Sequence, residues 1–185
     1  MEDLKKKIRE IPDWPKKGIN FKDITTLLAD GKVFVEVINL LAKPFLDNPC
    51  TTRVQGKKID KIVGIDARGF LIAAPIAYKL KCGLVIVRKP GKLPCDTIEK
   101  KYTLEYTSNT IQMHKDAILS KEKIVLIDDL IATGGTALAA CDLIEELGGE
   151  ILGISAIIDL PFLGGSEKLI KKGYKVRNLV SYESE

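Results

Sequence analysis

Apolar residues along this chain occur either in short continuous runs or at spacings of three to four residues. The runs predict buried strands over residues 59–65, 83–88, 124–127, 151–158 and 175–181. The helical spacings predict helices over residues 3–10, 33–46, 69–80, from about Gly135 onward, and 166–172. Because strands and helices alternate, the pattern predicts an α/β fold with a mainly parallel sheet flanked by helices.

Polar segments separate these elements. Residues 11–31 are rich in Pro, Gly and Asp, and we expect an ordered loop there because Trp14, Ile19 and Phe21 require burial. Residues 47–58 predict a surface loop and residues 89–101 a polar loop. Alternation over 102–107 and 110–114 predicts an antiparallel strand pair. Without a repeat or a linker, the chain reads as one domain, residues 1–185.

Composition narrows the class of protein. The 185 residues are 45% hydrophobic and 29% charged, which is typical of a globular domain with a substantial core. Neither a membrane-spanning run nor a signal peptide is evident, and the four cysteines lack CxxC spacing, so we expect a cytoplasmic protein with reduced thiols. The net charge of +4 comes with scattered lysines, which argues against a nucleic acid partner, and the lack of a membrane-spanning run argues against a membrane.

The most informative segment is residues 124–136, IVLIDDLIATGGT. A buried strand leads to two adjacent carboxylates, then to a turn of small residues and a helix start. The backbone amides at 132–136 could hold a phosphate, and Asp128 and Asp129 could accept hydrogen bonds from ribose hydroxyls or bind Mg²⁺. The segment fits neither GxxxxGK[ST] nor GxGxxG, so it predicts a ribose 5-phosphate compound rather than a dinucleotide. The alternative is an acidic turn capping an ordinary βα unit.

Two further predicted strands end in cationic residues. Arg68 lies in the turn of residues 65–70, and an arginine there could grip a diphosphate bidentately. Arg88 ends the strand predicted over 83–88, and Lys89 and Lys92 lie just beyond it; the alternative for these three cations is a solvated charge cluster. Ligands of open α/β sheets bind at the carboxyl ends of the strands. The three strand ends are therefore expected to share one anionic ligand.

The chain resembles a known family over nearly its whole length. The run 124–136 resembles the phosphoribosyl-diphosphate (PRPP) motif of type I phosphoribosyltransferases. Residues 12–24, PDWPKKGINFKDI, are similar to the N-terminal segment of adenine phosphoribosyltransferases. Further signatures of that family match at 68–70, 88–89, 91–94 and 104–106. The N-terminal segment and the Leu-Glu-Tyr triplet at 104–106 indicate adenine, because they are not general to phosphoribosyltransferases.

The resemblance implies a glycosyltransferase of purine salvage that converts adenine and PRPP to AMP and diphosphate with Mg²⁺. It implies the type I phosphoribosyltransferase fold, with a five-stranded, mainly parallel sheet flanked by helices. A small N-terminal hood (about residues 1–33) would cover a core (about 34–185), and a flexible flap would span about residues 89–110. A cytoplasmic homodimer is the usual form of the family.

The resemblance also implies roles for single residues on the PRPP side. The 5′-phosphate would be held by amides of Ala132, Thr133, Gly134, Gly135 and Thr136, and the ribose hydroxyls by Asp128 and Asp129. Ala67 and Arg68 match a diphosphate-binding loop in which the family has a non-prolyl cis peptide. Arg88 and Lys92 would reach the diphosphate of a neighbouring subunit. No direct protein ligand is expected for Mg²⁺, which PRPP and water would hold near Asp128 and Asp129.

On the base side, the resemblance implies that adenine lies between Phe21 and Leu160. Backbone groups near Asn20 and Lys22 would read its amine and ring nitrogens. The catalytic residue would be Glu105, which shares the proton on adenine N7 as the flap closes, with Tyr106 beside it at the substrate. Closure would also keep water from C1′.

Several positions depart from the family pattern. Lys22 stands where the family commonly has Arg, and Ala67 where some members have Ser. Pro90 lies inside the cationic loop, Thr107 replaces a Gly, and residues 50–56 resemble an insertion.

Two alternatives are a phosphoribosyltransferase for another purine base and a PRPP-sensing regulatory protein on the same fold. The Leu-Glu-Tyr triplet argues against the first. The retained Glu105 and flap cations, without an added nucleic-acid-binding domain, argue against the second.

Overall fold

A parallel sheet forms the centre of the computed structural model, which describes residues 2–46, 53–54, 57–104 and 107–184. Its strands are β5 (Lys61–Ile65), β6 (Gly83–Val87), β9 (Lys123–Ile131), β10 (Glu150–Asp159) and β11 (Val176–Ser181). They are ordered β11–β10–β9–β5–β6, and each neighbouring pair is parallel. The predicted α/β fold with a five-stranded parallel sheet is confirmed.

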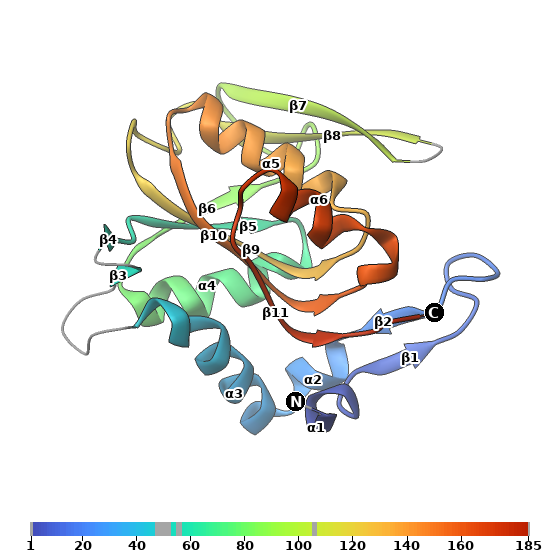
Figure 1. Ribbon diagram of the computed structural model, residues 1–185. Coiled ribbons are helices and arrows are strands. Elements are labelled where there is room, and N and C mark those ends of the chain that lie inside the picture. Colours follow the sequence, from blue (N-terminus) through green and yellow to red (C-terminus); the bar gives the residue numbers. More distant parts are fainter. Residues whose placement is uncertain (1, 47–52, 55–56, 105–106, 185) are drawn as a thin grey trace.

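Helices cover both faces of this sheet. They are α3 (Gly31–Ala42), α4 (Arg68–Leu80), α5 (Gly135–Glu146) and α6 (Gly165–Lys171). Figure 1 shows α3 and α4 below the sheet, and α5 and α6 above it. The helix predicted over 33–46 begins earlier, because the Asp30 side chain accepts hydrogen bonds from the amides of Lys32 and Val33. It ends before Pro44, which lies in the 3₁₀ turn η1 (Lys43–Phe45).

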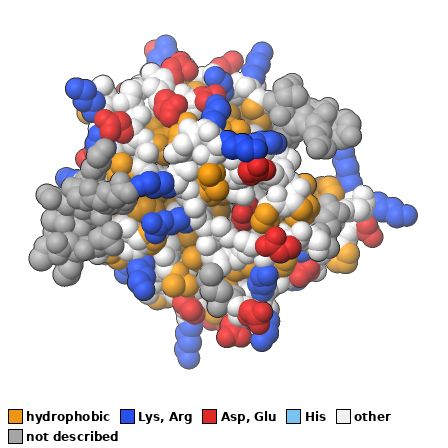
Figure 2. Space-filling view, viewed as in Figure 1, with side chains coloured by type: hydrophobic (Ala, Val, Ile, Leu, Met, Phe, Trp, Pro, Cys, Tyr) orange, Lys and Arg blue, Asp and Glu red, His pale blue; other side chains and the backbone are white. Residues whose placement is uncertain are grey.

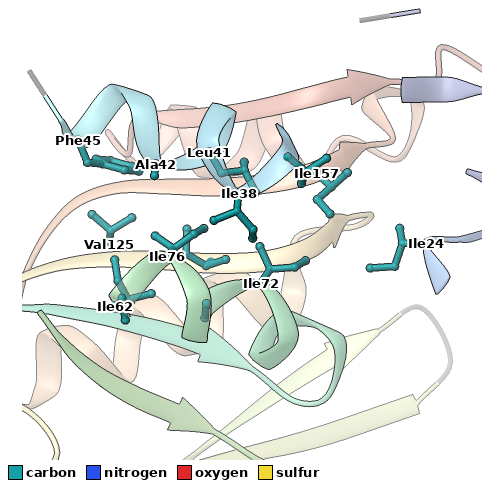
Figure 3. Close-up of a cluster of buried hydrophobic side chains, with 14 of the residues drawn as sticks. Ile24, Ile38, Leu41, Ala42, Phe45, Ile62, Ile72, Ile76, Val125 and Ile157 are labelled. Carbon is teal, nitrogen blue, oxygen red and sulfur yellow. The ribbon is translucent and has the colours of Figure 1, made fainter. Parts of the chain in front are cut away.

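The sheet is buried on both faces, as its continuous apolar runs predict. In β9, Val125 and Ile127 belong to the core between the sheet and helices α3 and α4, whereas Ile124 and Leu126 belong to the core between the sheet and α5. Figure 3 shows the first of these cores, where side chains of two helices meet the sheet: Ile38, Leu41, Ile72, Ile76, Ile62 and Val125. This double-sided core holds the carboxyl ends of the strands in fixed positions.

The N-terminal segment is more regular than its sequence predicts. It contains α1 (Glu2–Lys5), β1 (Arg9–Ile11), β2 (Phe21–Asp23) and α2 (Thr25–Ala29). The helix predicted over 3–10 is wrong beyond residue 5, because residues 9–11 instead pair with β2, a separate segment of the chain. The loop predicted over 11–31 contains β2 and α2, and Asp23 accepts a hydrogen bond from the amide of Thr25 where α2 begins.

A β-hairpin lies above the sheet next to α5. Its strands are β7 (Thr97–Leu104) and β8 (Thr107–His114). The predicted antiparallel pair is confirmed, but it begins earlier, since cross-strand pairing recruits polar residues of the stretch predicted as a loop over 89–101. Buried Ile111 and Met113 join the base of the hairpin to the core.

Two short strands, β3 (Arg53–Val54) and β4 (Lys57–Lys58), pair within the loop predicted over 47–58. Most of that loop, including much of the 50–56 insertion, lies outside the described residues. Figure 2 shows Lys and Arg side chains interspersed with Asp and Glu on the visible face. Within the described parts of the chain, no helix is both long and apolar enough to cross a membrane.

Candidate active site

The acid pair lies inside β9 rather than beyond its end. Pairing with β10 continues through Asp128 and ends at Ile131, so the strand outlasts its apolar run of 124–127. Asp129 is buried, with 6% of its surface exposed, while Asp128 is half-buried. Their adjacent positions in a strand direct the two carboxylates to opposite faces of the sheet.

The electrostatics of the pair favour a ligand that can donate hydrogen bonds. Burial raises the pKa of Asp128 well above its usual range, and the charge of Asp129 raises it further. Burial also raises the pKa of Asp129, against the opposing effect of Arg68. Within the pair, the Asp129 amide donates to Oδ1 of Asp128 over 2.9 Å. Hydroxyl or cation partners would stabilise both ionised forms.

The predicted phosphate loop follows β9 and leads into α5. Gly134 has φ of +79°, and α5 begins at Gly135, as predicted. The amides of the first helical turn have no partner within the helix, which makes the turn suitable for a phosphate. The backbone of a third glycine, Gly165, packs directly against the loop. A Cβ built at Gly165 would lie 2.1 Å from the carbonyl oxygen of Ala132. Sequence reasoning missed Gly165, although the Gly164–Gly165 pair was a signal of close backbone approach.

Arg68 connects the two predicted halves of the site. A cis peptide joins Asp66 to Ala67, as the family resemblance implies, and α4 begins at Arg68. The Nε atom of Arg68 lies 2.7 Å from Oδ2 of Asp129. Its guanidinium carbon lies 5.0 Å from the centroid of the Phe21 ring. The predicted diphosphate, ribose and base residues therefore meet at this arginine.

The start of α4 packs closely on the acid pair. A Cβ at Gly69 would lie 3.0 Å from Oδ1 of Asp128 and 3.2 Å from the carbonyl oxygen of Ile127. The absence of a side chain at this position lets the helix approach β9. Because α4 lies this close to β9, Arg68 at the start of the helix reaches Asp129.

Arg88 lies at the end of β6, on the other side of the cis peptide. Its Nε donates to Oδ2 of Asp66 over 3.0 Å, and its Nη1 to the carbonyl oxygen of Lys92 over 3.4 Å. Lys92 itself is exposed. The structure thus ties Arg88 to both Lys92 and Asp66, and sequence reasoning missed Asp66. The contact of Arg88 and Lys92 with a neighbouring subunit's ligand stays a prediction.

The hairpin touches the phosphate loop directly. The Thr136 hydroxyl donates to the Tyr102 hydroxyl over 3.0 Å. Beside this contact is a cavity of about 210 Å³, lined by Ile65, Asp66, Lys89, Tyr102, Asn109, Thr110, Ile111 and Thr136. Tyr102 is a further residue that sequence reasoning missed. The predicted Glu105 and Tyr106 lie outside the described residues.

The predicted base residues come from β2 and from the end of β10. The Phe21 ring meets Trp14 edge-on, with ring centroids 4.4 Å apart. Lys22 is buried, and its ammonium lies 2.6 Å from Glu10, to which Asn20 also donates over 2.7 Å. Leu160 follows β10, and its amide donates to the carbonyl oxygen of Ile131. Leu160 is thus fixed at the same sheet edge as the acid pair.

The chain shares these features with proteins of known class. Residues 24–180 match the model of the phosphoribosyl transferase domain. An adenine phosphoribosyltransferase of Chlorobium luteolum is 50% identical over 182 residues, covering 98% of this chain and 99% of that protein. One from Geobacter metallireducens is 51% identical over 169 residues, covering 91% and 94%.

Solved structures agree with the sequence relatives. The adenine phosphoribosyltransferase of Thermoanaerobacter pseudethanolicus superposes with a TM-score of 0.89 at 48% identity, covering 98% of this chain and 99% of that one. The Saccharomyces cerevisiae protein, complexed with adenine and an imino-altritol bisphosphate, gives 0.85 at 34% identity, covering 97% of each chain. The chain therefore belongs to the phosphoribosyltransferases, and within them to the adenine phosphoribosyltransferase family.

Proposed function

We propose that the protein transfers the 5-phosphoribosyl group of PRPP to N9 of adenine, producing AMP and diphosphate in purine salvage. The position of Arg68 carries this proposal. It contacts Asp129 on the sugar side and Phe21 on the base side, so one ligand can bridge the two halves. The relatives and solved structures named above support adenine as the acceptor.

The half of the site that holds the sugar and phosphate is built on β9 and α5. In the proposed complex, the amides of residues 132–136 hold the 5′-phosphate at the positive end of the α5 dipole. Asp128 and Asp129 accept hydrogen bonds from the ribose hydroxyls. Arg68 then exchanges its contact with Asp129 for one with the diphosphate, joined by Arg88 and Lys92, the last two acting across a homodimer interface.

The base half orients the nucleophile. Adenine stacks between Phe21 and Leu160, and backbone groups at Asn20 and Lys22 select its amine and ring nitrogens. As N9 attacks C1′ and diphosphate leaves, charge like that of an oxocarbenium ion develops on the sugar. Glu105 shares the proton on N7, and Tyr106 contacts the substrate from the same flap. The protein's main contributions are orientation and charge stabilisation, and the closed flap keeps water from C1′.

The proposal includes Mg²⁺, which would neutralise charge on the departing diphosphate. Carboxylate oxygens of Asp128 and Asp129 are the hard donors that Mg²⁺ prefers, and contact through water suits an ion that retains its hydration. The proposal also includes a cytoplasmic homodimer without nucleic acid or membrane partners. Its single domain has a hood of about residues 1–33, a core of about 34–185 and a flap of about 89–110.

A direct assay tests the proposal. Purified protein incubated with PRPP, Mg²⁺ and one purine base is expected to convert adenine, but not guanine or hypoxanthine, to its nucleotide, as followed by HPLC. Absence of AMP would reject the function, and preferred turnover of hypoxanthine would favour the alternative base. The Glu105→Gln variant is expected to lose far more kcat than PRPP affinity, and unchanged turnover would remove its catalytic role.

A further inference from the structure

The hood contains a lysine buried against a tyrosine ring. Lys22 is only 3% exposed, and its Nζ lies 2.6 Å from Oε2 of Glu10 and 4.3 Å from the centroid of the Tyr182 ring. A lysine this deeply buried requires a charged partner, and the face of an aromatic ring stabilises its ammonium further. We call Glu10, Lys22 and Tyr182 the Lys22 clamp.

The clamp lies directly behind the backbone that the base is proposed to contact. Glu10 stands opposite Lys22 in the register of β1 and β2, and Ile11 stands opposite Phe21. Asn20 donates to the same Glu10 oxygen that accepts from Lys22. Side chains alternate along a strand, so Asn20 and Lys22 are held on one face and Phe21 is presented on the other.

The charge of Glu10 is maintained by this arrangement. Its hydrogen bond from Lys22 lowers its pKa the most, and the one from Asn20 lowers it further, against the raising effect of burial. Glu10 is half-exposed as a side chain, whereas Lys22 is not. The carboxylate can therefore stay ionised at little cost in hydration while it compensates the buried ammonium.

Tyr182 connects the clamp to the other proposed wall of the base site. Its amide donates to the carbonyl oxygen of Asp159 over 3.1 Å, and Asp159 immediately precedes Leu160. A second cation, Lys5 of α1, lies 5.1 Å from the centroid of the same ring. The ring thus joins the hood, which carries Phe21, to the segment that carries Leu160.

We propose that Glu10 and Tyr182 are positioning residues for adenine. By holding Lys22, they set the spacing between the backbone of residues 20–22 and Leu160, and so determine how well the base fits. The inference rests on the proposed base site and does not involve the PRPP half. Loss of either partner loosens the hood, which lowers adenine affinity and leaves PRPP binding intact.

Steady-state kinetics of the full chain test the clamp. Glu10→Gln and Tyr182→Leu are expected to raise KM for adenine about fivefold or more, which is about 1 kcal/mol, while kcat and KM for PRPP stay within about twofold of wild type. Lys22→Met is expected to raise KM for adenine similarly, and adding Glu10→Gln to it should have no further effect, because the two residues act as one unit.

Two matched controls separate positioning from general damage. Tyr182→Phe retains the ring, and the Tyr182 hydroxyl has no hydrogen-bond partner among the described residues, so the kinetics of this variant should match wild type. Asp3→Asn removes an acidic group of α1 that pairs with Lys6 at the exposed surface, and it should also change nothing. A Tyr182→Phe effect as large as that of Tyr182→Leu would contradict the role of the ring.

The outcomes that overturn the inference are distinct from failure of the base site. Phe21→Ala and Leu160→Ala should both raise KM for adenine if the base site is correct. If they do so while Glu10→Gln and Tyr182→Leu do not, the clamp has no positioning role. An equal rise in both KM values, or a loss of kcat alone, would reject it as well. If Phe21→Ala and Leu160→Ala have no effect, the base site is elsewhere and the clamp fails with it.

Discussion

Adding one methyl group at Gly165 is expected to damage PRPP binding although Gly165 is not among the proposed substrate contacts. A Cβ at this position would lie 2.1 Å from the carbonyl oxygen of Ala132 and 2.6 Å from the amide nitrogen of Gly134. Ordinary contact begins at 3.4 Å, so the phosphate loop would have to retreat by about 1 Å. The α6 backbone that bears Gly165 cannot rotate away as a flexible side chain could.

The size of the effect follows from this displacement. A misplacement of about 1 Å in a positioning group can cost about 100-fold, so Gly165→Ala is expected to lower kcat/KM for PRPP by about that factor. Overpacking costs about 1–3 kcal/mol in stability, which lowers Tm by about 2–12 °C for a chain of this length. Steady-state kinetics measure kcat/KM, titration calorimetry with PRPP and Mg²⁺ measures the accompanying loss of PRPP affinity, and thermal melts measure Tm.

Two other glycines provide controls. Gly31 begins α3, and beyond its chain neighbours and the backbone of its own helix no atom of the described residues lies within 4 Å of the position that a Cβ would take. Gly31→Ala should therefore keep PRPP affinity and stability near or above wild type. Gly164 has φ of +70° and equally open surroundings, so Gly164→Ala adds strain without the clash and should lower Tm more than PRPP affinity. A folded Gly165→Ala protein with wild-type PRPP affinity would refute the phosphate-loop assignment.

Three further predictions concern the charged residues of the site. Asp128→Asn combined with Asp129→Asn should weaken PRPP binding by about 10-fold or more, because hydrogen bonds to charged groups contribute about 1.5–3 kcal/mol each; wild-type affinity by calorimetry would contradict the ribose assignment. The pKa of Asp128 is raised in the folded protein. At pH values between the ordinary carboxyl pKa and this raised pKa, the folded protein therefore binds more protons than the unfolded chain, and the stability of the ligand-free protein falls as pH rises. Asp128→Asn removes this contribution, and its Tm advantage over wild type should grow with pH; a constant difference would show that the group is not perturbed. Arg68→Lys retains the charge but loses the planar fork, and should weaken PRPP binding about tenfold, whereas Arg177→Lys on the exposed side of β11 should not.

The local chemistry of the PRPP half could be predicted because it is contiguous in the chain. The buried run at 124–127, the acid pair and the small-residue turn follow one another, and the helix begins at Gly135 as the pattern indicates. The same is true of the turn before α4, where Arg68 stands at the helix start. Only the extent of β9 differed, because strand pairing with β10 carries it past the acidic residues.

Contacts between distant segments could not be predicted, since no local pattern encodes them. Gly165 approaches Ala132 from a later element of the chain, and Tyr102 reaches Thr136 from the hairpin. Residues 9 and 10 lie within the stretch predicted as a helix, but residues 9–11 form a strand because β2 offers them cross-strand partners. In each case the contacting residue is distant in the sequence and lies nearby only in the folded chain.

The sequence by itself determined the α/β class, the family and the candidate residues at the strand ends, because apolar periodicity and short motifs depend on neighbours in the chain. Only the tertiary structure decided which of those residues contact one another. It places Arg68 between Asp129 and Phe21, ties Arg88 to Asp66 and buries Lys22 between Glu10 and Tyr182. These pairings depend on the sheet order and on close backbone approach, which are properties of the packed chain.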